Sequence, residues 1–172
     1  MASFTGLRLG ELRALRWRDV DFAGRIVHVR QNFVAGEFTS PKGKRLRSVP
    51  LIDQAMVVLD GLSRRERFTG EDDLVFPSVV GEPFEDSQLR RRFTGALSRA
   101  GLRKIRFHDL RHSFGTLAVQ AFPLSDVQAY MGHADEQTTM IYVHHVPKVD
   151  AADRLSALVK AETAPEMQAV GA

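Results

Sequence analysis

The chain contains no cysteine among its 172 residues, which excludes disulfide bonds and thiolate chemistry. It has no apolar run near the ~20 residues that a membrane-spanning helix requires. Its first residues, Met1 to Phe4, lack the basic and apolar regions of a secretory signal peptide. The sequence also has no internal repeat. With an apolar fraction of 44%, this length predicts one soluble, intracellular domain with a substantial core.

Basic residues slightly outnumber acidic residues, 24 to 21, which gives a net charge of +3 and a pI of about 9.6. Most of the cations are arginines, and a guanidinium group forms a rigid fork that matches phosphate oxygens. They gather in five clusters, at 13–18, 42–47, 64–67, 90–92 and 103–106. Any single cluster is more typical of a solvated helix face. Five clusters in one small basic domain favour a polyanionic partner.

Apolar periodicity predicts an α+β fold that is mainly α-helical, with a small antiparallel β-sheet. Helices are expected over 9–15, 53–67, 87–100, 109–121, 124–131, 136–144 and 149–161. Asp53, and either Asp86 or Ser87, are expected to cap two of these helices. Strands are expected over 25–31 and 45–50, joined by turn residues at Gly36 and 41–44, with 74–76 as a short extended segment.

Residues dispersed along the chain carry functional groups that make chemical sense as one set. Two arginines can offer bidentate forks to a phosphate, and a lysine at a hairpin tip can protonate a leaving oxygen. Histidines can move protons, and a tyrosine can attack phosphorus. The set is Arg8, Lys42, His108, Arg111, His133 and Tyr142. It is the inventory for cutting a nucleic-acid strand through a covalent phosphotyrosine without a metal.

Each of these residues also has an ordinary structural interpretation. Arg8 could pair with Glu11 on a helix surface, and Lys42 could simply solubilise a turn. Tyr142 could be a core aromatic residue with its hydroxyl at the surface. All of these interpretations would have to hold together, in this chain order, for the chemical one to fail.

The ordered motifs resemble those of the tyrosine recombinases, the phage-integrase family. The run from Thr5 to Leu12, continued by 15–21, is similar to the family's first arginine box. Residues 41–51 resemble its β-hairpin, and 108–114 match its second arginine box. Gly132-His133 and Tyr142 fall where the family has its second histidine and its nucleophile. The resemblance covers roughly residues 4 to 160 and implies the tyrosine-recombinase catalytic fold.

The resemblance implies a site-specific DNA recombinase that works without metal, cofactor or ATP. Tyr142 would form a 3′-phosphotyrosine, Arg8 and Arg111 would stabilise the transition state, and Lys42 would protonate the 5′ oxygen. His108 and His133 would hydrogen-bond the phosphate. Supporting roles fall on Glu11, which orients the site, and on Lys44, Arg45 and Arg47, which contact DNA phosphates. Tyr130 lacks the context of the 138–142 motif and is interpreted as a packing residue.

The resemblance also implies partners and boundaries. Double-stranded DNA is the expected partner of a cytoplasmic protein, encoded by a bacterium or a phage. The helix 149–160 is expected either to dock on a neighbouring protomer, in a tetramer on DNA, or to pack on its own domain. Residues 1–162 are expected to form an N-terminally truncated catalytic domain, followed by a flexible tail, 163–172. Truncation predicts bare apolar surface around Phe4, Leu7 and Leu9.

Three other functions stay open at this point. A non-catalytic DNA-binding remnant of a truncated integrase would keep the fold without cutting. A zinc hydrolase would use His108 and His112, at i and i+4, with a third histidine among His133, His144 and His145. A strand-cutting topoisomerase shares the chemistry but generally has lysine at the position of His108. Integration, resolution and transposition are equally compatible with the motifs.

Overall fold

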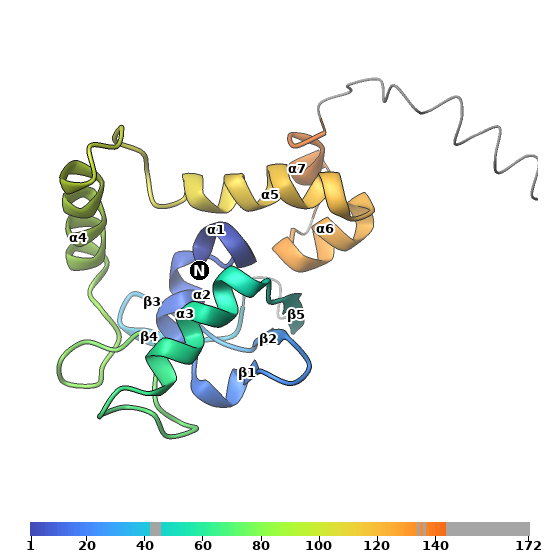
Figure 1. The fold of residues 1–172 in the computed structure, drawn as a ribbon. Helices are drawn as coiled ribbons and strands as arrows, with labels where there is room; N and C mark the ends of the chain where they lie inside the picture. The colour runs from blue at the N-terminus through green and yellow to red at the C-terminus, as the bar shows by residue number, and fades with distance from the viewer. Residues whose placement is uncertain (42–45, 134, 136, 144–172) are drawn as a thin grey trace, which may run out of the picture.

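The computed structural model describes residues 1–41, 46–133, 135 and 137–143. Lys42, Lys44, Arg45, the expected helix 149–160 and the tail 163–172 lie outside the described residues. The described part is mainly helical and contains two small antiparallel sheets (Figure 1). The predicted fold class is confirmed.

The elements follow the chain in a simple order. The helices are α1 (Ala2–Thr5), α2 (Leu9–Ala14), the 3-10 turn η1 (Trp17–Asp19), α3 (Asp53–Ser63), α4 (Asp86–Arg99), α5 (Asp109–Ala121), α6 (Leu124–Met131) and α7 (Gln137–Met140). The strands are β1 (Val20–Asp21), β2 (Ile26–Val29), β3 (Asn32–Val34), β4 (Glu37–Thr39) and β5 (Arg47–Pro50). The predictions for α2, α5 and α6 are confirmed to within a residue.

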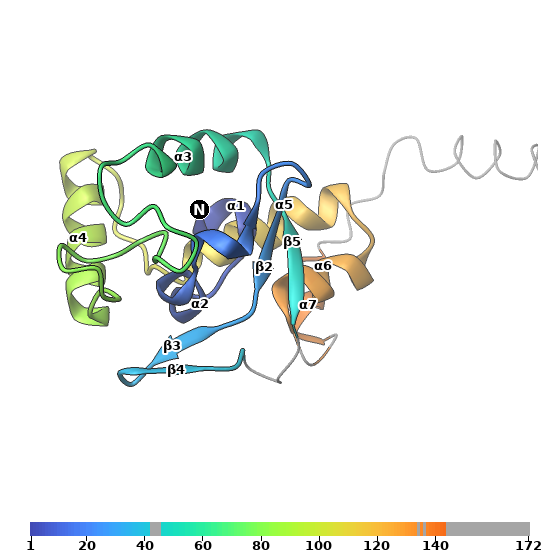
Figure 2. The same cartoon turned by 90° about the horizontal axis from the view of Figure 1, so that it is seen from below.

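The main sheet has the order β1-β2-β5, with antiparallel pairing throughout. Val27 of β2 lies opposite Val49 of β5, and both side chains are fully buried. Alternation along β2 also buries Val29, so one face of the sheet joins the core. The strands β3 and β4 form a separate hairpin, in which β3 packs against α2 (Figure 2). This second hairpin was not predicted.

The core lies between this sheet and the helices α1, α3, α5 and α6. Helix α5 packs along α1, and α6 packs against both α5 and β5. Leu59 of α3, Phe114 of α5, and Val127 and Met131 of α6 belong to one buried cluster. The end of α6 is therefore held beside the loop between α1 and α2, and this contact builds the functional site.

Helix α4 stands apart from this core, and none of its residues is buried (Figure 1). An apolar cavity of about 320 Å³ separates it from the first residues of the chain. Its lining includes Leu12, Leu89, Phe107 and Leu110. Bare apolar surface was expected around Leu7, but that expectation was wrong: Leu7 is only 1% exposed, while Phe4 and Leu9 are partly buried.

Three predictions about helix ends were also wrong. Ile52 and Glu85 occupy the N-cap positions of α3 and α4, so neither Asp53 nor Asp86 or Ser87 is the cap. Helix α3 ends at Ser63 and not near residue 67. The reason is tertiary: the guanidinium of Arg65 donates hydrogen bonds to backbone carbonyls of the 67–75 segment. Within the described residues, no helix is long and apolar enough to cross a membrane.

Candidate active site

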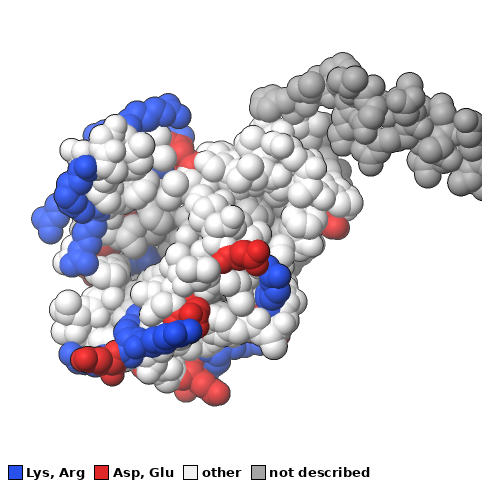
Figure 3. Space-filling model, viewed as in Figure 1, with Lys and Arg blue, Asp and Glu red and all other residues white. Residues whose placement is uncertain are grey.

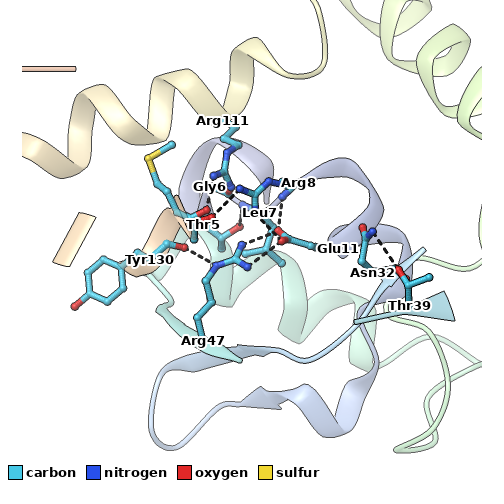
Figure 4. Close-up of polar contacts among 12 residues, drawn as sticks. Thr5, Gly6, Leu7, Arg8, Glu11, Asn32, Thr39, Arg47, Arg111 and Tyr130 are labelled. Atoms are coloured by element: carbon cyan, nitrogen blue, oxygen red, sulfur yellow. Dashed lines mark hydrogen bonds and ion pairs between the residues drawn. The ribbon is translucent and has the colours of Figure 1, made fainter. Parts of the chain in front are cut away.

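The first arginine box places a buried carboxylate between two guanidinium groups. Glu11, on the first turn of α2, is 1% exposed in its side chain. It accepts two hydrogen bonds from Arg47 of β5, at 2.8 and 2.6 Å, and one from Arg8 at 3.1 Å. It also accepts the backbone N–H of Arg8 at 2.7 Å. Figure 4 shows Arg8 and Arg47 converging on this carboxylate.

The two box arginines are held by carbonyl groups at helix ends. Arg8 donates to the carbonyl of Gly132, which follows α6, at 2.8 Å. Arg111, on the first turn of α5, donates to the carbonyls of Gly6 and Met131. Gly6 and Gly132 both adopt left-handed conformations, with φ of 63° and 61°, that end α1 and α6. The arginines thus join the α1–α2 loop, α5 and α6 (Figure 4).

Burial and charge set the ionisation of this cluster. Burial would raise the pKa of Glu11, but the hydrogen bonds and charge of Arg47 and Arg8 outweigh it and lower the pKa. Burial, together with the nearby charge of Arg8, lowers the pKa of Arg111 to about 10. Both groups therefore stay charged at neutral pH. One carboxylate among three guanidinium groups leaves the site electropositive and suited to an anion.

Tyr142 lies just after α7 and is buried against α5, with 6% of its surface exposed. Its hydroxyl lies 2.8 Å from Nδ1 of His112. Burial raises the pKa of the phenol, and the charge of nearby Arg111 opposes this rise. The predicted nucleophile thus lies close to Arg111, a predicted phosphate-binding arginine. Tyr142 and its contact His112 are 30 residues apart in the chain.

The two predicted histidines occupy different positions around Tyr142. The His133 ring is nearly parallel to the Tyr142 ring, at 6.4 Å and 14°, and its Nδ1 lies 2.9 Å from the Thr139 hydroxyl. Burial first, and then the charge of Arg111, lowers the pKa of His133 to about 4. His108 stands at the start of α5, where burial and then the charge of His112 lower its pKa. Both imidazoles are thereby favoured in the neutral form at pH 7.

The structure thus brings together most of the residues expected at the site. Arg8, Glu11, His108, Arg111, His133 and Tyr142 meet around the ends of α1, α5 and α6. Lys42, Lys44 and Arg45 lie outside the described residues. Arg47, an expected phosphate contact, instead has a side chain only 7% exposed and bonds Glu11 and the Tyr130 carbonyl. The ring of Tyr130 packs on Phe122.

Two residues of the site were not singled out by sequence reasoning. His112 was considered only as a metal ligand, yet it contacts the Tyr142 hydroxyl. Gly115, one turn further along α5, lies directly beneath the Tyr142 ring. The i, i+3 spacing of His112 and Gly115 places both on one face of the helix, and this spacing was the sequence signal that could have linked them. In the described segments, no three histidine, aspartate or glutamate side chains are grouped as a metal site; His144 and His145 fall outside these segments.

The model of the phage integrase family matches residues 1–148 of this chain. The chain belongs to the phage integrase family. Among its relatives is the tyrosine recombinase XerC of Xanthomonas axonopodis pv. citri (strain 306), 37% identical over 155 residues, which are 86% of this chain and 47% of the relative. The chain therefore spans about half the length of the relative that it matches.

Solved structures agree with this family assignment. The Tn1549 transposon integrase in complex with circular intermediate DNA has the same fold, with a TM-score of 0.70 and 22% identity over 92% of this chain and 57% of that chain. The XerH site-specific recombinase bound to its difH substrate has a TM-score of 0.65 and 28% identity, over 95% of this chain and 45% of that chain. The expected tyrosine-recombinase catalytic fold is confirmed.

Proposed function

We propose that this integrase-family chain is the catalytic domain of a site-specific DNA recombinase that cuts and rejoins strands through a covalent 3′-phosphotyrosine. One observation carries the proposal. Tyr142, Arg8, Arg111 and His133 come from separate elements, yet polar and ring contacts join them around the end of α6. The ring of Tyr142 packs in the core, and its hydroxyl group lies in reach of the charge of the anchored Arg111, which suits attack on a phosphate.

The proposed reaction uses the arginines as fixed charges. Arg8 and Arg111 are already held by backbone carbonyls and Glu11, so they need little reorganisation when a phosphate arrives. Negative charge that grows on the non-bridging oxygens in the transition state would meet both guanidinium groups. Neutral His108 and His133 would donate hydrogen bonds to the same phosphate. No metal ion is required in this scheme.

The leaving group and the DNA contacts complete the scheme. We assign protonation of the 5′ oxygen to Lys42, and phosphate contact to Lys44 and Arg45, from the family resemblance. Arg47 fits a different role, because its guanidinium group donates hydrogen bonds to the Glu11 carboxylate and the Tyr130 carbonyl. We assign it to positioning Glu11, which in turn orients Arg8. The pair Arg47–Glu11 is then part of the scaffold that keeps the site assembled.

We assign double-stranded DNA as the partner, since XerH was solved bound to its difH substrate. The basic clusters and the arginine-rich site support this assignment. Assembly into a tetramer on DNA through residues 149–160, a cytoplasmic location, and the domain limit at residue 162 remain parts of the same proposal.

Covalent capture tests the proposal. The protein is incubated with nicked duplexes from its genomic neighbourhood, denatured in SDS, and examined for chains shifted by attached DNA. We expect a shifted band that Tyr142→Phe abolishes without loss of DNA binding, because the variant lacks the attacking oxygen. Tyr130→Phe is the matched control and should capture DNA normally. Capture that persists in Tyr142→Phe would refute the assignment, and binding without any capture would support a non-catalytic remnant.

A further inference from the structure

The hydroxyl of Tyr142 has a hydrogen-bond partner, His112, that has no role in the reaction proposed above. Nδ1 of His112 lies 2.8 Å from Oη, and the two rings are 5.7 Å apart. In the part of the chain that the structure describes, this is the only hydrogen-bond partner recorded for that hydroxyl. The distance suits a hydrogen bond in which the phenol donates and the imidazole accepts. A base in this position is ready to receive the proton of an attacking tyrosine.

The surface of α5 is shaped to hold the tyrosine in this position. Gly115 lies one turn after His112 and therefore on the same face of the helix. A Cβ atom at Gly115 would lie 2.6 Å from Cζ of Tyr142, closer than packing allows. The missing side chain therefore admits the ring, while His112 engages the hydroxyl beyond it. This seat, made by His112 and Gly115, fixes Oη relative to the neighbouring Arg111.

The other histidines of the site are worse placed to take the phenolic proton. Nδ1 of His133 is engaged by the Thr139 hydroxyl at 2.9 Å, and the ring lies nearly parallel to the Tyr142 ring. His108 meets the edge of the His112 ring, with centroids 4.9 Å apart, and so stands one residue further from the phenol. Geometry therefore singles out His112 among the three.

We propose that His112 is a catalytic residue of the cleavage step, the general base that deprotonates Tyr142. As Oη attacks phosphorus, its proton passes to Nδ1 of His112 and the bond from phosphorus to the 5′ oxygen breaks. The departing oxygen takes a proton from the acid, which we assign to Lys42. In rejoining, the 5′ hydroxyl returns its proton to the acid and the tyrosine oxygen recovers its own from His112. This inference rests on the proposed recombinase function.

A first experiment tests the contact itself and needs no DNA. In the protein with ¹⁵N-labelled histidine, the His112 Nδ1 resonance should be that of an unprotonated nitrogen that accepts a hydrogen bond. Tyr142→Phe should shift this resonance, while the resonances of His28, whose partner is Ser48, stay in place. An unchanged His112 resonance, or a protonated Nδ1 in the neutral ring, would overturn the proposal.

A second experiment separates the base from the acid. DNA with sulfur in place of the bridging 5′ oxygen has a leaving group that needs no proton. His112→Gln keeps a polar side chain that cannot take up a proton, so covalent capture should slow by roughly 10²- to 10⁴-fold, the usual contribution of a general base. The sulfur substrate should not restore its rate. The same substrate should restore capture by Lys42→Ala.

The controls distinguish the outcomes. Ser113→Ala, an exposed neighbour on α5, should capture DNA at the wild-type rate, and thermal unfolding should show that His112→Gln remains folded. In His112→Ala, added imidazole should restore part of the rate. Wild-type rates in His112→Gln would overturn the role of His112 and leave the recombinase proposal intact. Failure of the wild-type chain to capture either substrate would overturn both.

Discussion

At the residue scale, the site depends on which groups are charged and which are neutral. Arg8 and Arg47 bond the Glu11 carboxylate, and the charge of Arg111 lies near it, so an incoming phosphate meets net positive charge. The same charges, acting with burial, keep His133 neutral by lowering its pKa to about 4. A neutral imidazole can donate one hydrogen bond and accept another, and here Nδ1 faces the Thr139 hydroxyl. The arrangement therefore has a measurable dependence on pH.

We expect His133 to make the protein sensitive to acid. The pKa of this residue is near 6.5 in an unfolded chain and about 4 in the folded protein. Between these values the unfolded state binds more protons, so the free energy of unfolding falls as the pH falls. Urea unfolding should show that the wild type loses more stability than His133→Gln when the pH is lowered from 7 to 4.5. An equal difference between the two proteins at both pH values would contradict this account.

At the element scale, left-handed helix ends supply the carbonyls that hold the arginines. The loop after α1 offers the Gly6 carbonyl to Arg111, and the end of α6 offers the Gly132 carbonyl to Arg8. The ring of Phe114 lies against Gly6, with Cδ1 2.4 Å from where a Cβ would stand. Gly6 thus provides the left-handed backbone conformation and the close contact between α1 and α5, and its carbonyl group also holds Arg111.

Gly6→Ala should therefore be costly. An L-residue in the left-handed region costs about 1–2 kcal/mol, and crowding against Phe114 should add about 1–3 kcal/mol. Gly36→Ala is the matched control, since its φ is +85° and nothing lies within 4 Å of an added Cβ. Urea unfolding should show a larger loss for Gly6→Ala than for Gly36→Ala. Equal losses would mean that the contact between α1 and α5 carries no energy at this position.

At the scale of the whole molecule, the charge is unevenly distributed. Figure 3 shows basic side chains gathered over α4, whereas acidic and basic side chains alternate over the lower part of this face. Arg91 and Arg99 of α4 are exposed, and no ion pair is recorded for either among the described residues. By contrast, Arg18 and Arg64 pair with Asp72 and Asp60. A polyanion should therefore prefer the α4 surface.

Charge reversal on α4 should weaken DNA binding. The double variant Arg91→Glu, Arg99→Glu should bind DNA less tightly, and each lost phosphate contact should reduce the salt slope of log K by about 0.9. The double variant Arg18→Glu, Arg64→Glu changes the net charge equally and is the control. Fluorescence anisotropy over a range of salt concentrations would measure both. Equal losses in the two variants would show that only net charge matters, and not the α4 surface.

Much of this architecture could be predicted from the sequence because its signals are local. The apolar periodicity of α5 and α6 and the β-forming residues of β2 and β5 predict these elements without tertiary information. The end of α3 could not be predicted, since it depends on Arg65 reaching carbonyls of a later segment. The burial of Leu7 likewise arises from packing between elements that are distant in sequence.

The candidate site, too, could be predicted from the sequence only in part. Motif order predicted which residues would meet, and Arg8, Glu11, Arg111, His133 and Tyr142 do lie together. The pairing of Arg47 with Glu11 and of His112 with Tyr142 joins residues 36 and 30 positions apart. No local pattern encodes such pairs. Arg47, which was expected to contact phosphate, and His112, which was weighed as a metal ligand only in an alternative interpretation, therefore have partners in the fold that were not predicted.

The most direct measurement is the identity of the residue that carries DNA after capture. Trapped complexes are digested with nuclease and trypsin, which releases the peptide 112–148 with both tyrosines of the chain, and fragment ions locate the residual nucleotide. The account predicts a nucleotide mass on Tyr142. A nucleotide on Tyr130, or on any other residue, would contradict it.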